Sequence, residues 1–157
     1  MADLTLNTIT YNQIIQKFED IITANKFIKT FVAGDIYEID LKETTYLYAH
    51  LSIENAAFDN AQLTYSFRLY IMDIVDKSEN NENDVLSDTL QVINDVVNEF
   101  RNGSTTFGLA TMQNYQIQDN ITCEPFTERF DNEVAGWAAN IDVTVINHFN
   151  ACNNPYS

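Results

Sequence analysis

Basic residues are scarce in this sequence. Lysine and arginine together number 8, against 23 aspartates and glutamates, and the formal net charge is −15 at pH 7. A chain of this charge repels phosphate groups and has no basic stripe with which to grip nucleic acid. The acidity has three possible uses: solubility, a surface that mimics DNA, or the wall of a channel through which DNA slides without sticking.

Cysteines and long apolar stretches are also rare. Cys123 and Cys152 lie too far apart for a metal knuckle and are too few for a disulfide framework, so we expect two reduced thiols. No stretch approaches the roughly 20 uninterrupted apolar residues of a membrane span, and the N-terminus does not resemble a secretory signal. We therefore expect no membrane contact and a location in the cytoplasm where the chain is made.

Catalytic motifs are missing too. The sequence contains no Walker A loop and no GxGxxG, HExxH, GxSxG or CxxC motif. The acidic loop at residues 76–84 lacks the glycine and the terminal glutamate of an EF-hand. Neither His50 nor His148 has a recognisable triad partner. We predict no catalytic residue, no cofactor and no metal, and hence a protein that is not an enzyme.

What the chain does have is core-forming material. Hydrophobic residues make up 45% of its 157 residues, including 10 phenylalanines and 8 tyrosines. A chain of this length and composition buries roughly two-thirds of its unfolded surface. We expect residues 1–157 to form a single structural domain, with a loose C-terminal arm over about 147–157.

Two segments have helical periodicity. Residues 11–25 begin after Thr10, a natural N-cap, and Gln13 completes a possible capping box. Residues 84–102 form the second helix, which ends before Gly103. The expected core positions of the two helices are Ile14, Ile15, Phe18, Ile21 and Ile22, and then Leu86, Leu90, Ile93, Val97 and Phe100.

Other segments alternate with period two and are predicted strands. The clearest is 63–75, in which Phe67 faces the core, and another runs from 135 to 145, with Trp137 on its core side. The remaining predicted strands are 36–41, 46–53, 112–118 and 121–126, with a turn at 55–60. Together these elements predict an α+β fold, an antiparallel β-sheet with the two amphipathic helices packed on one face.

Several tyrosines fall on the strand face away from the helices. Cross-strand pairing within the sheet explains such tyrosines as well as a subunit interface does, since tyrosine suits both. The candidate interface residues are Tyr37, Tyr46, Tyr48, Tyr70 and Tyr156.

Local phrases of the sequence resemble the neck and tail-terminator proteins of tailed bacteriophages, the group of head-tail connector rings. The phrases are Phe31-Val-Ala-Gly-Asp35, Tyr65-Ser-Phe-Arg-Leu-Tyr-Ile-Met-Asp73, Val85-Leu-Ser-Asp-Thr-Leu90, Phe126-Thr-Glu-Arg-Phe-Asp131 and Val134-Ala-Gly-Trp137. They spread over about four-fifths of the chain, and none is a catalytic fingerprint.

The resemblance implies a tail-terminator-like structural virion protein. Such a subunit forms a homo-oligomeric ring at the head-tail junction or the tail terminus, contacts other connector, neck or tail proteins, and passes genomic DNA through its lumen. It is made in the host cytoplasm and ends in the virion. The alternatives are an acidic DNA-mimic inhibitor protein and, less favoured by the motifs, a small hydrolase.

Overall fold

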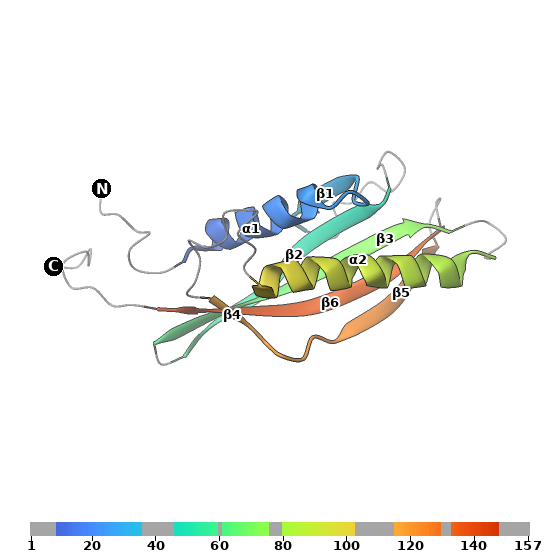
Figure 1. The fold of residues 1–157 in the computed structure, drawn as a ribbon. Coiled ribbons are helices and arrows are strands. Elements are labelled where there is room, and N and C mark those ends of the chain that lie inside the picture. The colour runs from blue at the N-terminus through green and yellow to red at the C-terminus, as the bar shows by residue number, and fades with distance from the viewer. Residues whose placement is uncertain are drawn as a thin grey trace.

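The structure is a computed structural model that describes residues 9–35, 46–59, 61–75, 80–102, 115–129 and 133–147. Its elements follow the order helix, three strands, helix, three strands (Figure 1). Their bounds are α1 Tyr11–Ala24, β1 Thr30–Ala33, β2 Tyr48–Asp59, β3 Gln62–Ile74, α2 Glu82–Asn102, β4 Tyr115–Ile117, β5 Cys123–Arg129 and β6 Glu133–Ile146. The α+β class is confirmed.

Helix α1 begins where its capping box predicts. The Thr10 side chain accepts a hydrogen bond from the Gln13 backbone, and the Gln13 side chain accepts one from the Thr10 backbone. These two bonds satisfy N–H groups that the first turn of a helix leaves unpaired. One apolar stripe of the helix, Ile14, Phe18, Ile21 and Ile22, is fully or almost fully buried.

Helix α2 is present, but its buried stripe differs from the predicted one. Leu90 is 39% exposed, so its prediction as a core residue is wrong. Thr89 is buried instead, because its hydroxyl donates to the Val85 carbonyl at 2.7 Å and so needs no outside partner. The buried apolar positions of the helix are Val85, Val92, Ile93, Val96, Val97 and Phe100.

The sheet is mixed and not purely antiparallel, which corrects the sequence prediction. Its strand order is β1-β2-β3-β6-β4, and β5 also pairs with β6. The β2–β3, β3–β6, β4–β6 and β5–β6 pairs are antiparallel, whereas β1 runs parallel to β2. Strand β1 was not predicted, and the predicted strand at 36–41 lies outside the described residues.

Strand β2 continues through the predicted turn at 55–60 and reaches Asp59. Its register with β3 shifts between Ile53 and Asn55, which makes Glu54 the extra residue of a bulge. The bulge reverses side-chain parity, so Phe58 comes to share the helix-facing side with Leu51. The alternation that predicts a strand is broken at this point, and the sequence therefore suggested that the strand ended.

Strands β4 and β5 lie along the same edge of β6 with a gap between them. The Gln118 side chain fills this gap: its Oε1 accepts from the Asp142 backbone N–H at 2.7 Å, and its Nε2 donates to the Asn140 carbonyl at 2.8 Å. The Asn140 N–H donates to the Thr122 carbonyl at 3.2 Å. The side-chain amide of Gln118 thus substitutes for a missing peptide group and supplies hydrogen-bond partners to the backbone of β6 in the gap.

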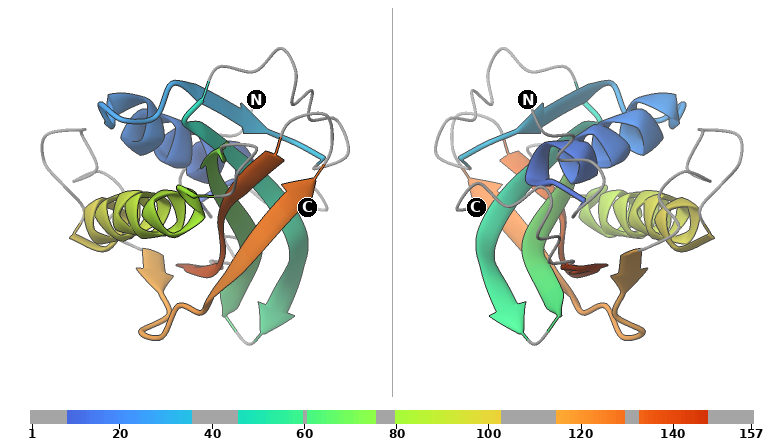
Figure 2. Two further views of the ribbon diagram at one scale, coloured as in Figure 1. Left: turned by 90° about the vertical axis from the view of Figure 1, so that its right-hand side faces the viewer. Right: turned by 90° about the vertical axis from the view of Figure 1, so that its left-hand side faces the viewer.

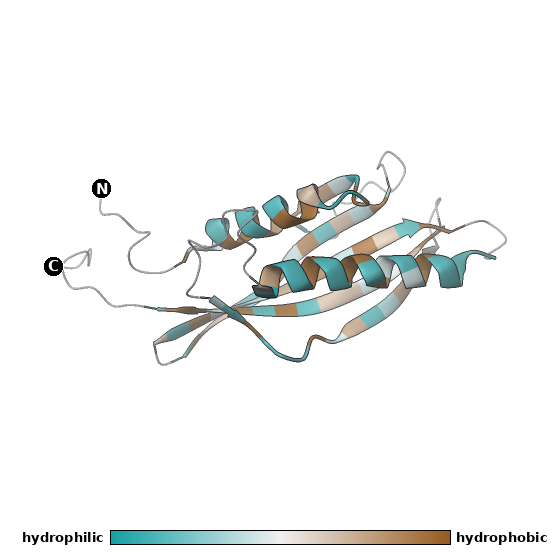
Figure 3. Cartoon of the chain, viewed as in Figure 1, coloured by the Kyte–Doolittle hydropathy of each residue, from teal (hydrophilic) through white to brown (hydrophobic). Residues whose placement is uncertain are grey.

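Both helices cover one face of the sheet, as predicted (Figures 1 and 2). Their apolar sides turn toward the strands, and their outer sides are hydrophilic (Figure 3). Phe18 of α1 stacks on Phe100 of α2 with ring centroids 4.5 Å apart and meets Phe67 of β3 edge-on at 5.2 Å. Trp137 lies on this helix-facing side, where its indole N–H donates to the Leu86 carbonyl at 2.7 Å.

Truncation of Phe67, which is 1% exposed, should cost far more than truncation of Leu90. We expect Phe67→Ala to lower the free energy of unfolding by about 3–5 kcal/mol because it leaves a cavity between α1 and β3. The matched surface variant Leu90→Ala should cost less than about 1 kcal/mol. Equilibrium urea unfolding measures both, and equal losses would contradict the assignment of faces.

Candidate subunit interface

Three of the five predicted interface tyrosines come together in the structure. Tyr48 and Met72 are buried with Val134 on the sheet side away from the helices, and Tyr46, Tyr70 and Phe126 pack around them. Tyr70 meets Phe126 edge-on with ring centroids 5.9 Å apart. These six residues form the tyrosine cluster. Tyr37 and Tyr156 lie outside the described residues.

Within the cluster, the three tyrosines differ in exposure. Tyr48 is only 2% exposed, so in the single chain it offers almost no surface to a neighbour. Tyr46 and Tyr70 are half-buried and form the cluster's accessible rim. The alternation of the strand predicted which face the tyrosines occupy, but it held no information on how deeply the chain covers them.

His50 is the polar centre beside this cluster. It is completely buried, its Nε2 lies 3.0 Å from the Gly34 carbonyl oxygen, and its Nδ1 lies 3.1 Å from the Tyr48 hydroxyl. Because a carbonyl only accepts, Nε2 donates to it, and in the neutral ring Nδ1 accepts from Tyr48. The histidine therefore ties the end of β1 to β2 and has a structural role.

Burial also changes the chemistry of Tyr48. Removal from water, with a smaller contribution from nearby Tyr46, raises the pKa of the Tyr48 phenol to about 12 from its ordinary value of 10.0. Tyrosinate is strongly disfavoured in this apolar cluster. The hydroxyl therefore remains a donor to His50 throughout the neutral range.

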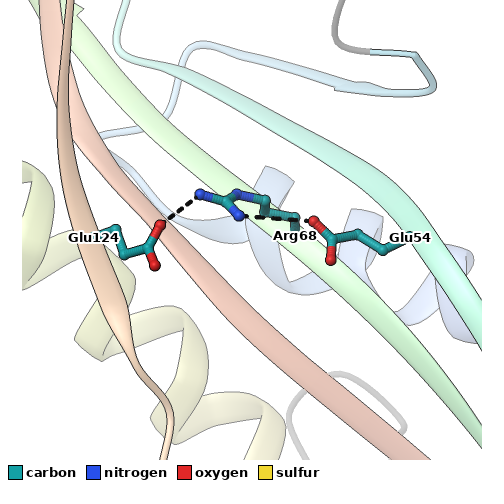
Figure 4. A network of polar contacts seen from close by, with 3 residues as sticks. All are labelled: Glu54, Arg68 and Glu124. Atoms are coloured by element: carbon teal, nitrogen blue, oxygen red, sulfur yellow. Dashed lines mark hydrogen bonds and ion pairs between the residues drawn. The ribbon is translucent and has the colours of Figure 1, made fainter.

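Arg68 lies on the same helix-free face and joins three strands (Figure 4). Its Nη2 donates to Glu124 of β5 at 2.8 Å, and its Nη1 lies 3.7 Å from a carboxylate oxygen of Glu54 in β2. The guanidinium also lies 5.6 Å from the ring centroid of Tyr70. Each such exposed ion pair contributes about 0–1 kcal/mol, so the network mainly fixes the position of β5 relative to β2.

A second surface, the acidic stripe of α2, was missed by the sequence interpretation. It consists of Asp84, Asp88 and Asp95, with Gln91 and Asn98 between and beyond them, on the side of the helix opposite its buried residues. The one basic residue of the helix, Arg101, donates to the carbonyls of Gln118 and Asp119 at 3.0 and 2.7 Å. The helical spacing of these acids was available in the sequence and could have revealed the stripe.

The described residues include no group of three or more histidine, cysteine, aspartate or glutamate side chains placed to hold a metal ion. Cys123 is a free thiol whose pKa is raised by burial. Among the described helices, none is long and apolar enough to cross a membrane.

No protein-family model matches the chain, and a search of curated proteins finds no match.

Replacement of Tyr48 by phenylalanine should change how stability depends on alkaline pH. The folded-state pKa of Tyr48 is about 12 and the ordinary value is 10.0, so the unfolded chain loses this proton first as the pH rises. Wild-type stability should therefore fall through the window from pH 10 to about 12. In Tyr48→Phe, urea unfolding should show a shallower fall, and absorbance at tyrosinate wavelengths should lose one late-titrating phenol. An unchanged alkaline fall would contradict the buried placement of Tyr48.

Gly136 should tolerate no side chain, because β6 approaches β3 too closely beside the tyrosine cluster. A Cβ at this position would lie 1.9 Å from the Ile71 carbonyl oxygen, which belongs to the backbone and cannot rotate away. We expect Gly136→Ala to cost about 3 kcal/mol or more. The opposite change on the same strand face, Ala138→Gly, should cost about 1 kcal/mol. Thermal or urea unfolding compares them, and a Gly136→Ala variant as stable as wild type would refute this close approach.

Proposed function

We propose that this chain is a structural subunit of a tailed-bacteriophage particle. Its copies form a closed ring at the head-tail junction or the tail terminus, join head to tail, and surround the channel through which DNA passes. The proposal includes a tail-terminator-like fold and a non-catalytic role. Its support is the resemblance of local sequence phrases, the α+β sheet with two helices on one face, and the surface charge.

The acidic stripe of α2 is the observation that carries the proposal. A rise of 1.5 Å per residue extends the stripe over about 16 Å between Asp84 and Asp95. Asp84 and Asp88 are exposed, and Arg101 already serves the chain's own carbonyls. In a ring, each subunit would repeat this stripe around the lumen, and the summed negative field would keep the DNA backbone from adhering.

Ring closure requires two different surfaces on each subunit, since a cyclic ring has head-to-tail contacts. The rim of the tyrosine cluster, Tyr46 and Tyr70, offers one such surface. Half-buried tyrosines suit this task because they bury area and retain a hydroxyl for hydrogen bonding. Tyr48 supports the rim from beneath and is not itself expected to contact the neighbour.

The second candidate is an acidic DNA-mimic inhibitor, and the same stripe favours it. Carboxylates four residues apart on a helix are separated by about 6 Å along its axis, a spacing of the same order as successive backbone phosphates. The two functions differ in assembly. A mimic acts as a monomer or dimer that competes with DNA for a DNA-binding enzyme. A channel subunit forms rings and does not compete with DNA for an enzyme.

Charge reversal on α2 tests the ring proposal. We expect Asp84→Lys, Asp88→Lys and Asp95→Lys combined to leave the ring intact in electron micrographs, because these positions face away from the core. The ring should then bind double-stranded DNA, with an affinity that falls about tenfold or more as salt rises from 50 to 200 mM. Particles that carry it should pass DNA poorly.

The matched control places positive charge on α1 by combining Glu19→Lys with Asp20→Lys. This variant should neither bind DNA in the ring nor impair passage, since the proposal assigns the channel to α2. Equal effects from both helices would show that the stripe does not line the lumen. A wild-type chain that stays monomeric at high concentration and inhibits a DNA-binding enzyme would favour the mimic.

A further inference from the structure

Over more than half of its length, the outer edge of β2 has no strand partner among the described residues. Strand β1 pairs only with residues 48–51, and the last bond on this side runs from the Gly34 N–H to the Leu51 carbonyl at 2.9 Å. From residue 52 to 58, no described strand lies against this edge. At about 3.3 Å per residue the open edge is roughly 23 Å long. An unpaired strand edge is a template for another strand.

The open edge also carries exposed apolar side chains. Ile53 is 41% exposed and Phe58 is 76% exposed, and both lie on the helix-facing side because they pair with Phe67 and Leu63 of β3. Tyr11 of α1, 39% exposed, stacks above Phe67 and extends this apolar row. Residues 52–58 include no lysine and no proline, two of the usual protections of an edge. An added strand would bury this row with its alternate side chains.

The C-terminal residues 148–157 suit this edge in charge, length and pattern. Their sequence, HFNACNNPYS, contains no aspartate, glutamate, lysine or arginine, so it brings no acidic side chain toward a chain of charge −15. Phe149 and Ala151 alternate with polar residues, as a strand with one apolar side requires. Ten extended residues reach about 33 Å, which exceeds the length of the edge.

The same segment reaches its own edge poorly. Strand β6 ends beside the β2–β3 hairpin, where Ile146 pairs with Gln62, and both β3 and β2 separate it from the open edge. Crossing three strand spacings of about 4.8 Å takes about 14 Å, or roughly five residues. The crossing would consume Phe149 and Ala151, the apolar part of the segment. The open β2 edge of a second copy can pair with the apolar part of the segment without such a crossing.

We propose that residues 148–157 of one copy add as a strand to the open β2 edge of a second copy, over residues 52–58. This inference rests on the proposed ring, for which it names a contact between neighbours. Within the ring it supplies the two unlike surfaces that head-to-tail closure needs, a donated strand and an accepting edge.

The N-terminal residues 1–8 are the competing occupant. They join the fold at Ile9, whose carbonyl accepts from the Tyr65 hydroxyl at 3.3 Å, and Tyr65 pairs with Ala56 of the open edge. Two strand spacings, about 10 Å, separate β3 from the outer side of β2, and crossing them takes about three residues. The five residues left for pairing, 1–5, include Asp3, which would bring a further carboxylate toward this acidic chain.

Four variants of the full chain separate these occupants. The first ends at Asn147, the second lacks residues 2–7, and the third is Ala56→Pro with Ala56→Ser as its matched control. Ala56 and Leu51 have their side chains on the same face of β2. Residues of one strand whose side chains share a face direct their backbone N–H and C=O groups to the same edge. The Leu51 carbonyl points to the outer edge, where it accepts from Gly34, so the Ala56 N–H points to that edge as well. Proline there removes a donor of the open edge and leaves the β3 ladder intact.

Sedimentation and native mass spectrometry measure assembly, and circular dichroism with urea unfolding checks the fold. We expect the chain ending at Asn147 and Ala56→Pro to weaken association by about tenfold or more, equivalent to about 1.4 kcal/mol. Ala56→Ser and the deletion of residues 2–7 should assemble like wild type. All four should retain the circular dichroism spectrum of the folded chain.

Cross-linking identifies the donor directly, because Cys152 lies within the proposed strand. In a Cys123→Ser background, Asn55→Cys or Ala57→Cys should form a disulfide with Cys152 upon mild oxidation, because an added strand with Phe149 on the apolar row turns Cys152 to the same side as these two positions. Mixing ¹⁵N-labelled and unlabelled protein should show by mass spectrometry that the bond joins two copies. Adding Cys152→Ser should abolish it.

Each remaining outcome decides one of the two proposals. If the chain ending at Asn147 still forms rings, or if only the N-terminal deletion disperses them, the strand-donation inference is overturned and the ring proposal stands. Tail-dependent pairs that never close into rings would support strand donation and overturn the ring. A full-length chain that remains monomeric would overturn both.

Discussion

The fold depends on the pairing of its two central strands. Strands β3 and β6 remain in register from Gln62 opposite Ile146 to Ile74 opposite Val134, along nearly the whole length of both. One side of this ladder supplies the floor on which both helices pack, and the other supplies the tyrosine cluster. Every other strand pairs directly with one of these two or, in the case of β1, through β2. The close contact at Gly136 shows how little space separates them.

Sequence periodicity predicts those segments whose burial is one-sided and regular. The apolar residues of α1 recur with the helical period, and burial alternates over residues 62–71 of β3 and 139–146 of β6, so the faces of these segments follow from the residues. Three features break the regularity. The bulge at Glu54 reverses parity in β2, a buried threonine replaces a leucine in the stripe of α2, and the gap between β4 and β5 is filled by a side chain. No period in a sequence records such local substitutions.

The parallel strand β1 was missed for a different reason. It has four residues, Thr30–Ala33, and its burial pattern is not alternating. Its place in the sheet depends on a hydrogen bond from buried His50 to the Gly34 carbonyl and on the ladder with β2, both of which join residues distant in sequence. The same limit applies to the candidate interface: the face of Tyr48 followed from alternation, whereas its burial depends on Met72 and Val134 from other strands.

The indole of Trp137 gives the molecule an internal reporter. It is the only tryptophan in the chain, and it bridges the sheet and α2 through its bond to the Leu86 carbonyl. Indole emission is therefore confined to one contact between layers, at the end of α2 from which the acidic stripe begins. Loosening of that helix from the sheet becomes visible as a change in emission wavelength, separately from unfolding of the tyrosine cluster on the opposite face.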